Sequence, residues 1–189
     1  MNMIRLILFI AAVGTASVVS AGIVQQAIIL AVPVMQVKDG AVQGCGYRLK
    51  AIPKDFAGQA SFVALDISFN LYSSGLGLVK GGAQHIVLKD GNPRSTNGQA
   101  ESFWLKVEGD KPTTAAEGKV LQSPDTGYLL YEVSVEAISK LFAGLLRGSP
   151  MTLGVRVKGE PIDRIYSGSV QVSEQDKRQG GECLREVIK

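Results

Sequence analysis

His85 is the one histidine among the 189 residues of this sequence, so a nucleophile–base–acid site would have to use it. A serine and an acid could join it in space, because such sites are defined by geometry and not by chain order. The chain has no Gly-x-Ser-x-Gly segment that would present a serine hydroxyl at a sharp turn. His85 is therefore expected to be an ordinary strand residue, and a hydrolase that uses it is the alternative.

Asp66 and Glu132 are the carboxylates whose positions best suit general acid–base chemistry, which glycosidases perform with two carboxyl groups. Asp66 falls on the polar side of an alternating segment, and Glu132 falls near the end of another. Carboxylates in such positions are more often solvated or ion-paired. One histidine and two distant cysteines exclude the familiar zinc sites, and the glycine-rich stretch 75–82 lacks the order of a phosphate-binding loop. No cofactor or metal is predicted.

Trp104, the one tryptophan, is the residue that most strongly indicates a binding function. Phe103, Leu105 and Val107 alternate with it, so Trp104 and Lys106 fall on the polar side of their segment. An outward aromatic ring can stack on a sugar or anchor a protein partner. Trp104 and Lys106 are therefore the predicted partner-binding residues; the alternative is that a helix or lysine stems cover the ring.

The charge of the chain is modest and evenly spread, at a formal +3 without runs of like charge. A nucleic-acid-binding surface would require a basic stripe, so no nucleic-acid partner is expected. Several basic residues fall on the polar sides of strand-like segments, and as neighbours they would form a cationic patch for anionic glycans or lipid head groups. They are Arg48, Lys50, Lys106, Arg156, Lys158 and Arg164.

Residues 1–21 have the order of a secretory signal peptide. Arg5 precedes the apolar run Leu6–Val13, and the compact residues Val19-Ser20-Ala21 precede a cleavage site before Gly22. An uncleaved membrane anchor is the alternative, although Gly, Thr and Ser interrupt the apolar stretch. The mature chain, residues 22–189, is expected to be one β-rich domain without a transmembrane span, located in the periplasm or secreted.

Cys45 and Cys183 are the two cysteines, and both follow the predicted cleavage site. In an oxidising compartment such a pair is more often bonded than free. No Cys-x-x-Cys spacing suggests a redox-active thiol. A Cys45–Cys183 disulfide is therefore predicted. It would join the first hairpin of the mature chain to its C-terminal tail and contribute about 5 kcal/mol on a chain-entropy model.

Period-two alternation of apolar residues dominates the mature chain and predicts an all-β sandwich or barrel-like fold of about eight or nine antiparallel strands. One α-helix is expected over 135–147, with Ser134 as its N-cap and Gly148 at its end. Residues 90–98 are expected to form a surface loop, and the segment after Val172 a polar tail. The predicted strands lie near 27–37, 41–52, 61–72, 76–88, 101–108, 118–123, 127–133, 151–158 and 162–172.

Export, a disulfide-linked β fold and the lack of a recognised catalytic motif favour one function above the others. The chain is predicted to be a non-catalytic binding or assembly module of the cell envelope, with another envelope protein or a glycan as partner. A secreted hydrolase of envelope polymers, working through carboxylates or His85, is the first alternative. A small-ligand carrier with an enclosed apolar cavity is the second.

Overall fold

The computed structural model describes residues 22–89, 92–114 and 119–188, so the predicted signal peptide lies outside the described residues. Within these ranges the chain forms twelve strands, a short 3-10 helix and two α-helices. The elements are β1 (Val24–Lys38), β2 (Ala41–Pro53), η1 (Lys54–Phe56), β3 (Ser61–Tyr72), β4 (Gly77–Lys89), β5 (Asn92–Asn97), β6 (Ala100–Val107), β7 (Thr113–Thr114), β8 (Lys119–Leu121), β9 (Leu129–Val133), α1 (Val135–Leu146), β10 (Met151–Val157), β11 (Arg164–Gly168), β12 (Val170–Gln171) and α2 (Glu174–Val187).

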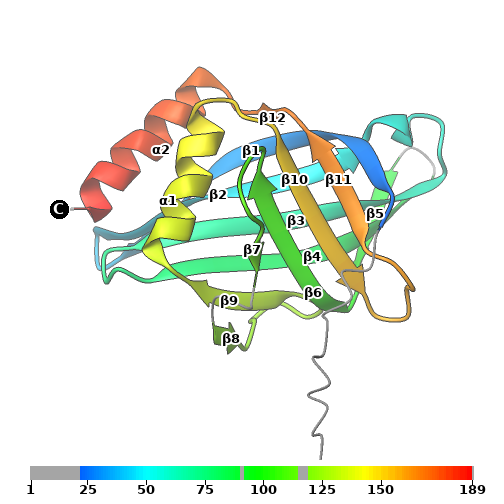
Figure 1. Cartoon of the computed structure of the whole chain (residues 1–189), viewed down its shortest axis with the longest axis horizontal. Coiled ribbons are helices and arrows are strands. Elements are labelled where there is room, and N and C mark those ends of the chain that lie inside the picture. The colour runs from blue at the N-terminus through cyan, green and yellow to red at the C-terminus, as the bar shows by residue number, and fades with distance from the viewer. Residues whose placement is uncertain (1–21, 90–91, 115–118, 189) are drawn as a thin grey trace, which may run out of the picture.

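The strands form one curled sheet in the order β7-β6-β10-β11-β1-β2-β3-β4-β9-β8. Strand β12 pairs with β1, and β5 pairs with β4. The long strand β1 joins the two halves of the sheet, because its first residues pair with β11 and its remaining length pairs with β2. In Figure 1 the strands β6, β10 and β11 cross steeply in front of β2, β3 and β4.

The core lies between these two layers, where alternate side chains of each layer face the other. Phe103 of β6 stacks on Tyr131 of β9 with ring centroids 4.5 Å apart. Gly81 of β4 makes room for Phe103, since a Cβ atom there would lie 2.5 Å from the ring. The largest fully buried side chains are Tyr47, Tyr166, Phe69, Ile29, Leu49, Leu65, Ile67, Leu105, Ile138, Leu141, Leu145 and Met151.

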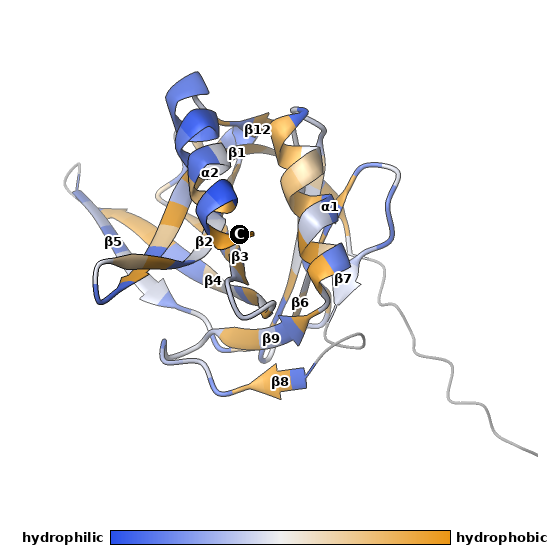
Figure 2. Ribbon diagram, turned by 90° about the vertical axis from the view of Figure 1, so that its left-hand side faces the viewer, coloured by the Kyte–Doolittle hydropathy of each residue, from blue (hydrophilic) through white to orange (hydrophobic). Residues whose placement is uncertain are grey.

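Helix α1 covers one end of the space between the layers (Figure 2). The Ser134 side chain accepts a hydrogen bond from the backbone N–H of Ala137, and Gly148 ends the helix in a left-handed conformation with φ 72°. Its apolar stripe is buried in the core, and Phe142 contacts the ring of Phe69 edge-on at 5.1 Å. The helix predicted over 135–147 is therefore confirmed.

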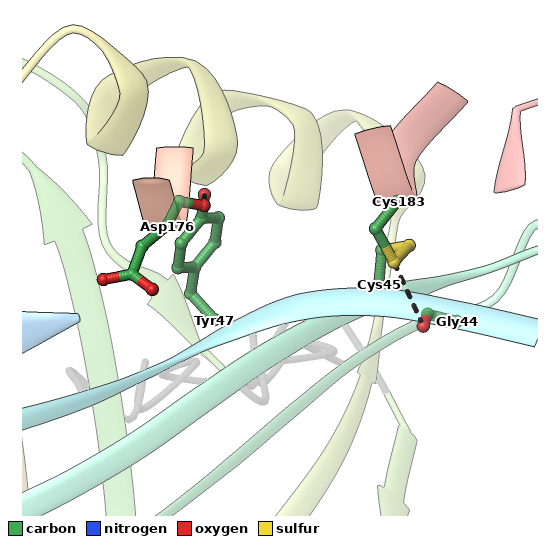
Figure 3. The surroundings of a disulfide bond; sticks show 5 residues. All are labelled: Gly44, Cys45, Tyr47, Asp176 and Cys183. Atoms are coloured by element: carbon green, nitrogen blue, oxygen red, sulfur yellow. Dashed lines mark hydrogen bonds between the residues drawn. A yellow bond between two sulfur atoms is a disulfide. The ribbon is translucent and has the colours of Figure 1, made fainter. Parts of the chain in front are cut away.

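Helix α2 lies beside α1 at the same end of the space between the layers (Figures 1 and 2). The predicted disulfide is confirmed: Cys183 of α2 is bonded to Cys45 of β2, with Cα atoms 5.7 Å apart (Figure 3). The hydroxyl of Tyr47 also donates a 3.1 Å hydrogen bond to the carbonyl oxygen of Asp176. Gly180 allows this approach, because a Cβ atom there would lie 2.0 Å from that hydroxyl.

The predicted fold class is confirmed, and the structure corrects several details of it. The strand count is higher than the predicted eight or nine, and β1 pairs in parallel with β11 and β12 instead of the sheet being wholly antiparallel. The predicted loop contains β5, which hydrogen-bonds to β4 through its backbone. The predicted polar tail is helix α2, whose buried side is anchored by the disulfide.

Candidate functional site

A polar groove of about 740 Å³ crosses the outer face of β2, β3 and β4, on the side opposite the core. We call it the outer groove. Arg48, Asp66, Ser68, Asn70, Lys80 and Tyr128 are among the residues that line it. Alternation along β3 explains its composition: Leu65, Ile67 and Phe69 face the core, so the intervening polar residues face outward. These polar residues are nonetheless buried, with Asp66 only 3% exposed.

The segment between β8 and β9 folds over this face and creates the depth of the groove. Lys80 of β4 forms a 2.6 Å ion pair with Asp125 of this segment. The Asn97 side chain donates a 3.1 Å hydrogen bond to the carbonyl oxygen of Thr126. The Lys80 ammonium nitrogen also lies 5.8 Å from the ring centroid of Tyr128. The groove is therefore bounded by side chains that are distant in sequence.

Asp66 occupies the centre of the hydrogen-bond network in the groove. Arg48 binds its carboxylate with two N–H groups, and Tyr128 donates its hydroxyl to Oδ2 at 2.9 Å. The pair with Asp66 raises the pKa of Arg48, which keeps the guanidinium charged. Burial, together with the negative charge of Asp66, raises the pKa of Tyr128, so the hydroxyl remains a donor. The carboxylate therefore acts as an acceptor for two fixed partners.

Asn70 differs from its neighbours because its side-chain oxygen has no partner. Among the described residues, Asn70 Oδ1 is the buried side-chain polar atom without a hydrogen bond. The residue lines the groove and is 9% exposed. It packs onto Gly46 of β2, where a Cβ atom would lie 2.4 Å from Oδ1. Buried polar atoms are nearly always satisfied, so this acceptor is open to a donor that the protein itself does not supply, a water or a ligand.

The structure does not bring His85 and Asp66 together as parts of a Ser–His–Asp site. The two side chains project from opposite faces of the sheet, because Asp66 lies in the outer groove while His85 lines a separate recess with Val63 and Arg164. Glu132 of β9 stands on the outer face opposite Leu78, but it does not line the groove. The structure therefore does not bring the three predicted acid–base candidates together.

Trp104 lies on the outer face of the other layer and is half-buried. Its indole rests on Gly154 of β10, where a Cβ atom would lie 2.2 Å from the ring. Lys106 follows on the same face, opposite Thr152. These two residues are remote from the outer groove in the sheet order, since β6 lies in the opposite layer. Their predicted role in partner binding stays a prediction.

Three of the six outward basic residues that were predicted to form a cationic patch are paired with acidic side chains, and for Lys50, Lys106 and Lys158 the patch stays a prediction. Arg48 pairs with Asp66, and Arg156 pairs with Asp163 at 2.6 Å. Arg164 is held by both carboxylate oxygens of Glu160. Each of these positive charges has an acidic partner that alternation alone did not assign to it.

Sequence reasoning singled out Asp66 but missed the other members of the groove. The sequence pattern places Arg48 in a basic patch and gives no role to Tyr128 or Asn70. A signal was available for Asn70, because an Asn within an apolar strand is uncommon and Gly46 occupies a paired position in the neighbouring strand. Tyr128 follows a Pro-Asp-Thr-Gly turn, and no local pattern shows where that turn folds.

Two kinds of feature are absent from the described residues. No group of three or more His, Cys, Asp or Glu side chains gathers where it could hold a metal ion. None of the helices in this part of the chain is both long and apolar enough to cross a membrane.

Comparison of the chain with protein families, with curated proteins and with solved structures finds no match.

Proposed function

We propose that this protein is an exported, non-catalytic binding module of the cell envelope, located in the periplasm or secreted, and that its ligand occupies the outer groove. The partner is a glycan or another envelope protein. The N-terminal segment with the order of a signal peptide supports export. The buried disulfide supports an oxidising compartment.

The observation that carries the binding proposal is the state of the polar groups in the groove. Its charged residues are paired with one another, and Asn70 Oδ1 is left without a partner. A buried acceptor that no protein group satisfies costs stability unless a water or a ligand supplies a donor. The volume of the groove falls within the range of small-molecule sites, about 300–1,000 Å³.

The hydrolase alternative receives less support from the same residues. A general acid or base must exchange a proton with substrate, but both oxygens of Asp66 accept hydrogen bonds from Arg48 or Tyr128. The carrier alternative needs an enclosed apolar cavity, whereas the described interior contains close-packed aromatic side chains such as Tyr47, Phe69 and Phe142.

Photo-crosslinking in the native envelope tests the proposal. A probe replaces Gln36, an exposed residue on the groove, and a matched probe replaces Gln171, an exposed glutamine of β12 outside it. A third probe replaces Trp104 to test the surface predicted from the sequence. We expect a discrete adduct at position 36 that disappears when Asn70→Leu is added, and none at position 171.

Two results would contradict the binding proposal. One is the absence of discrete adducts at both 36 and 104. The other is hydrolysis of an envelope polymer that Asp66→Asn or His85→Ala abolishes. An adduct at 104 without one at 36 would retain a binding module but move its site to Trp104 and Lys106.

A further inference from the structure

The outer groove carries no net charge. Its lining includes two positive residues, Arg48 and Lys80, and two negative ones, Asp66 and Asp125. Each positive residue pairs with one of the negative ones. An ionic ligand would gain little from the field of a site whose charges already neutralise one another. The groove therefore favours an uncharged ligand.

The polar groups that remain available suit hydroxyl groups. Asn70 and Gln84 are amides, which both donate and accept hydrogen bonds. The Asn97 amide is already held, because it accepts from Gln84 Nε2 at 3.5 Å and donates to the carbonyl oxygen of Thr126. Arg48 has five N–H donors, of which Asp66 uses two, and its side chain is 56% exposed. A ligand hydroxyl also donates and accepts at once, so one ring with several hydroxyls can match these groups together.

A peptide strand would not find its usual partners here. Extended peptides bind sheets mainly through backbone hydrogen bonds at a free edge. The groove lies instead on the face of β2, β3 and β4, whose backbone groups are paired with each other along their length. Recognition in the groove must therefore use side chains.

The groove also offers apolar and aromatic surface. Tyr72, half-buried, lines it with its ring packed against Gly44 of β2. Val34, Leu78 and Leu130 add aliphatic surface beside the amides. A sugar ring has the matching character, since its C–H faces are apolar and its rim carries hydroxyls.

From these observations we infer that the ligand of the outer groove is an uncharged oligosaccharide, with Asn70 pairing to a sugar hydroxyl and Tyr72 contacting a ring face. The inference rests on the binding function proposed above and names its ligand class. Asn70 meets the ligand by rotation of its amide, whose terminal torsion is soft.

Isothermal titration of the disulfide-bonded mature chain tests the ligand class. The probes are neutral cello- and malto-tetrasaccharides and the fully N-acetylated chito-tetrasaccharide, the anionic tetragalacturonate of similar size, and a tetra-alanine peptide. We expect one or more neutral probes to bind. We expect Asn70→Leu to weaken that binding about tenfold or more, the effect of removing one hydrogen bond to a buried group. Tyr72→Leu is expected to weaken binding similarly, whereas Tyr72→Phe retains it.

Thermal unfolding of the same variants separates a binding role from a structural one. Because Asn70 Oδ1 has no partner in the free protein, Asn70→Leu should leave the melting temperature unchanged or raise it. Gln171→Leu, outside the groove, is the matched control and should change neither the melting temperature nor the affinity. A lower melting temperature for Asn70→Leu with unchanged affinity would overturn the assignment of Asn70.

The remaining outcomes distinguish the ligand class from the binding function. Binding of tetragalacturonate or of the peptide, with the same dependence on Asn70, overturns the ligand class and keeps the groove as a binding site. If no neutral probe binds but crosslinks form at position 36 in the envelope, the ligand class is likewise overturned and the groove is kept as a binding site. Failure of all probes together with absent crosslinks overturns the proposed function as well.

Discussion

The hydroxyl of Tyr128 donates a 2.9 Å hydrogen bond to Oδ2 of Asp66, which lies 62 positions earlier in the chain. This bond fastens the segment between β8 and β9 to the middle of β3. Gly82 makes the contact possible, because a Cβ atom there would lie 2.9 Å from the ring of Tyr128. A polar sheet face that would otherwise be open to water is thereby converted into a groove.

Asp66→Asn should lower the free energy of unfolding by about 2 kcal/mol, measured by urea denaturation. An amide nitrogen would face donors from Arg48 or Tyr128, and one of these hydrogen bonds would be lost in a buried site. Glu136→Gln is the control, because Glu136 is exposed in the first turn of α1, where the loss of its ion pair with Lys140 and of its charge at the helix N-terminus should cost clearly less stability than the loss of a buried hydrogen bond. Equal effects of the two substitutions would contradict the central role of Asp66.

The stability of the protein should fall as pH rises above about 10. Burial raises the pKa of Tyr47, Tyr128 and Tyr166 in the folded state, while tyrosine in the unfolded chain ionises near its ordinary value. Above that pH the unfolded state binds fewer protons than the folded state, so unfolding becomes more favourable. Urea denaturation across this range should show a shallower decline for Tyr128→Phe. An unchanged slope would contradict the raised pKa of Tyr128.

Removal of the disulfide should release α2 before it affects the sheet. The buried side of α2 is small, formed by Gly180, Cys183 and Val187, so the bond to Cys45 supplies much of its attachment. The double substitution of both cysteines by alanine should lower the free energy of unfolding by about 2–5 kcal/mol. Hydrogen exchange should show lost amide protection in α2 and retained protection in α1. Simultaneous loss in both helices would contradict this order.

Gly154→Ala should displace the indole of Trp104, because the new Cβ atom would lie 2.2 Å from the ring. Trp104 is the one tryptophan, so intrinsic fluorescence reports its environment directly, and we expect a red shift as the ring becomes more exposed. Gly181→Ala in α2 is the control, since nothing lies within 4 Å of its added Cβ atom. That control should leave the emission unchanged and stabilise the helix by about 0.5–1 kcal/mol.

Protein recovered from the envelope should begin at Gly22, with both cysteines oxidised. Intact-mass analysis after alkylation without reductant measures both properties in one experiment. A mass that includes residues 1–21 would favour the uncleaved anchor. Two alkylated thiols would contradict an oxidising compartment.

Local patterns in the sequence were sufficient for most of the strands, the first helix and the disulfide, but they did not predict β5, β7 or the break between β11 and β12. Alternating apolar residues determine which side of a strand is buried, so alternation alone assigns Cys45 to the core face, where it is fully buried. Ser134 and Gly148 lie at the two ends of helix α1 (Val135–Leu146) and act through interactions within one turn of chain. Two cysteines allow only one intramolecular pairing. These features depend on neighbours close in sequence or on simple counting.

Helix α2 and strand β5 required tertiary contacts. Residues 174–187 are polar and contain two glycines, but Ser173 caps their first turn and Cys183 anchors them to β2. The spacing of Gly180, Cys183 and Val187 was a usable signal that the polar composition masked. Strand β5 has no alternation because both its faces are exposed, and it is held by backbone pairing with β4.

The sequence determined which residues face outward, whereas only the tertiary structure decided which outward residues meet. Arg48, Asp66 and Tyr128 come from three segments far apart in the chain, and their contact depends on strand register and on the path of the segment before β9. Alternation assigns a side chain to one face of the sheet but not to a partner on that face, because every second residue of every strand falls on the same face. The outer groove and the unpaired oxygen of Asn70 therefore exist only once the sheet has curled and that segment has folded over it.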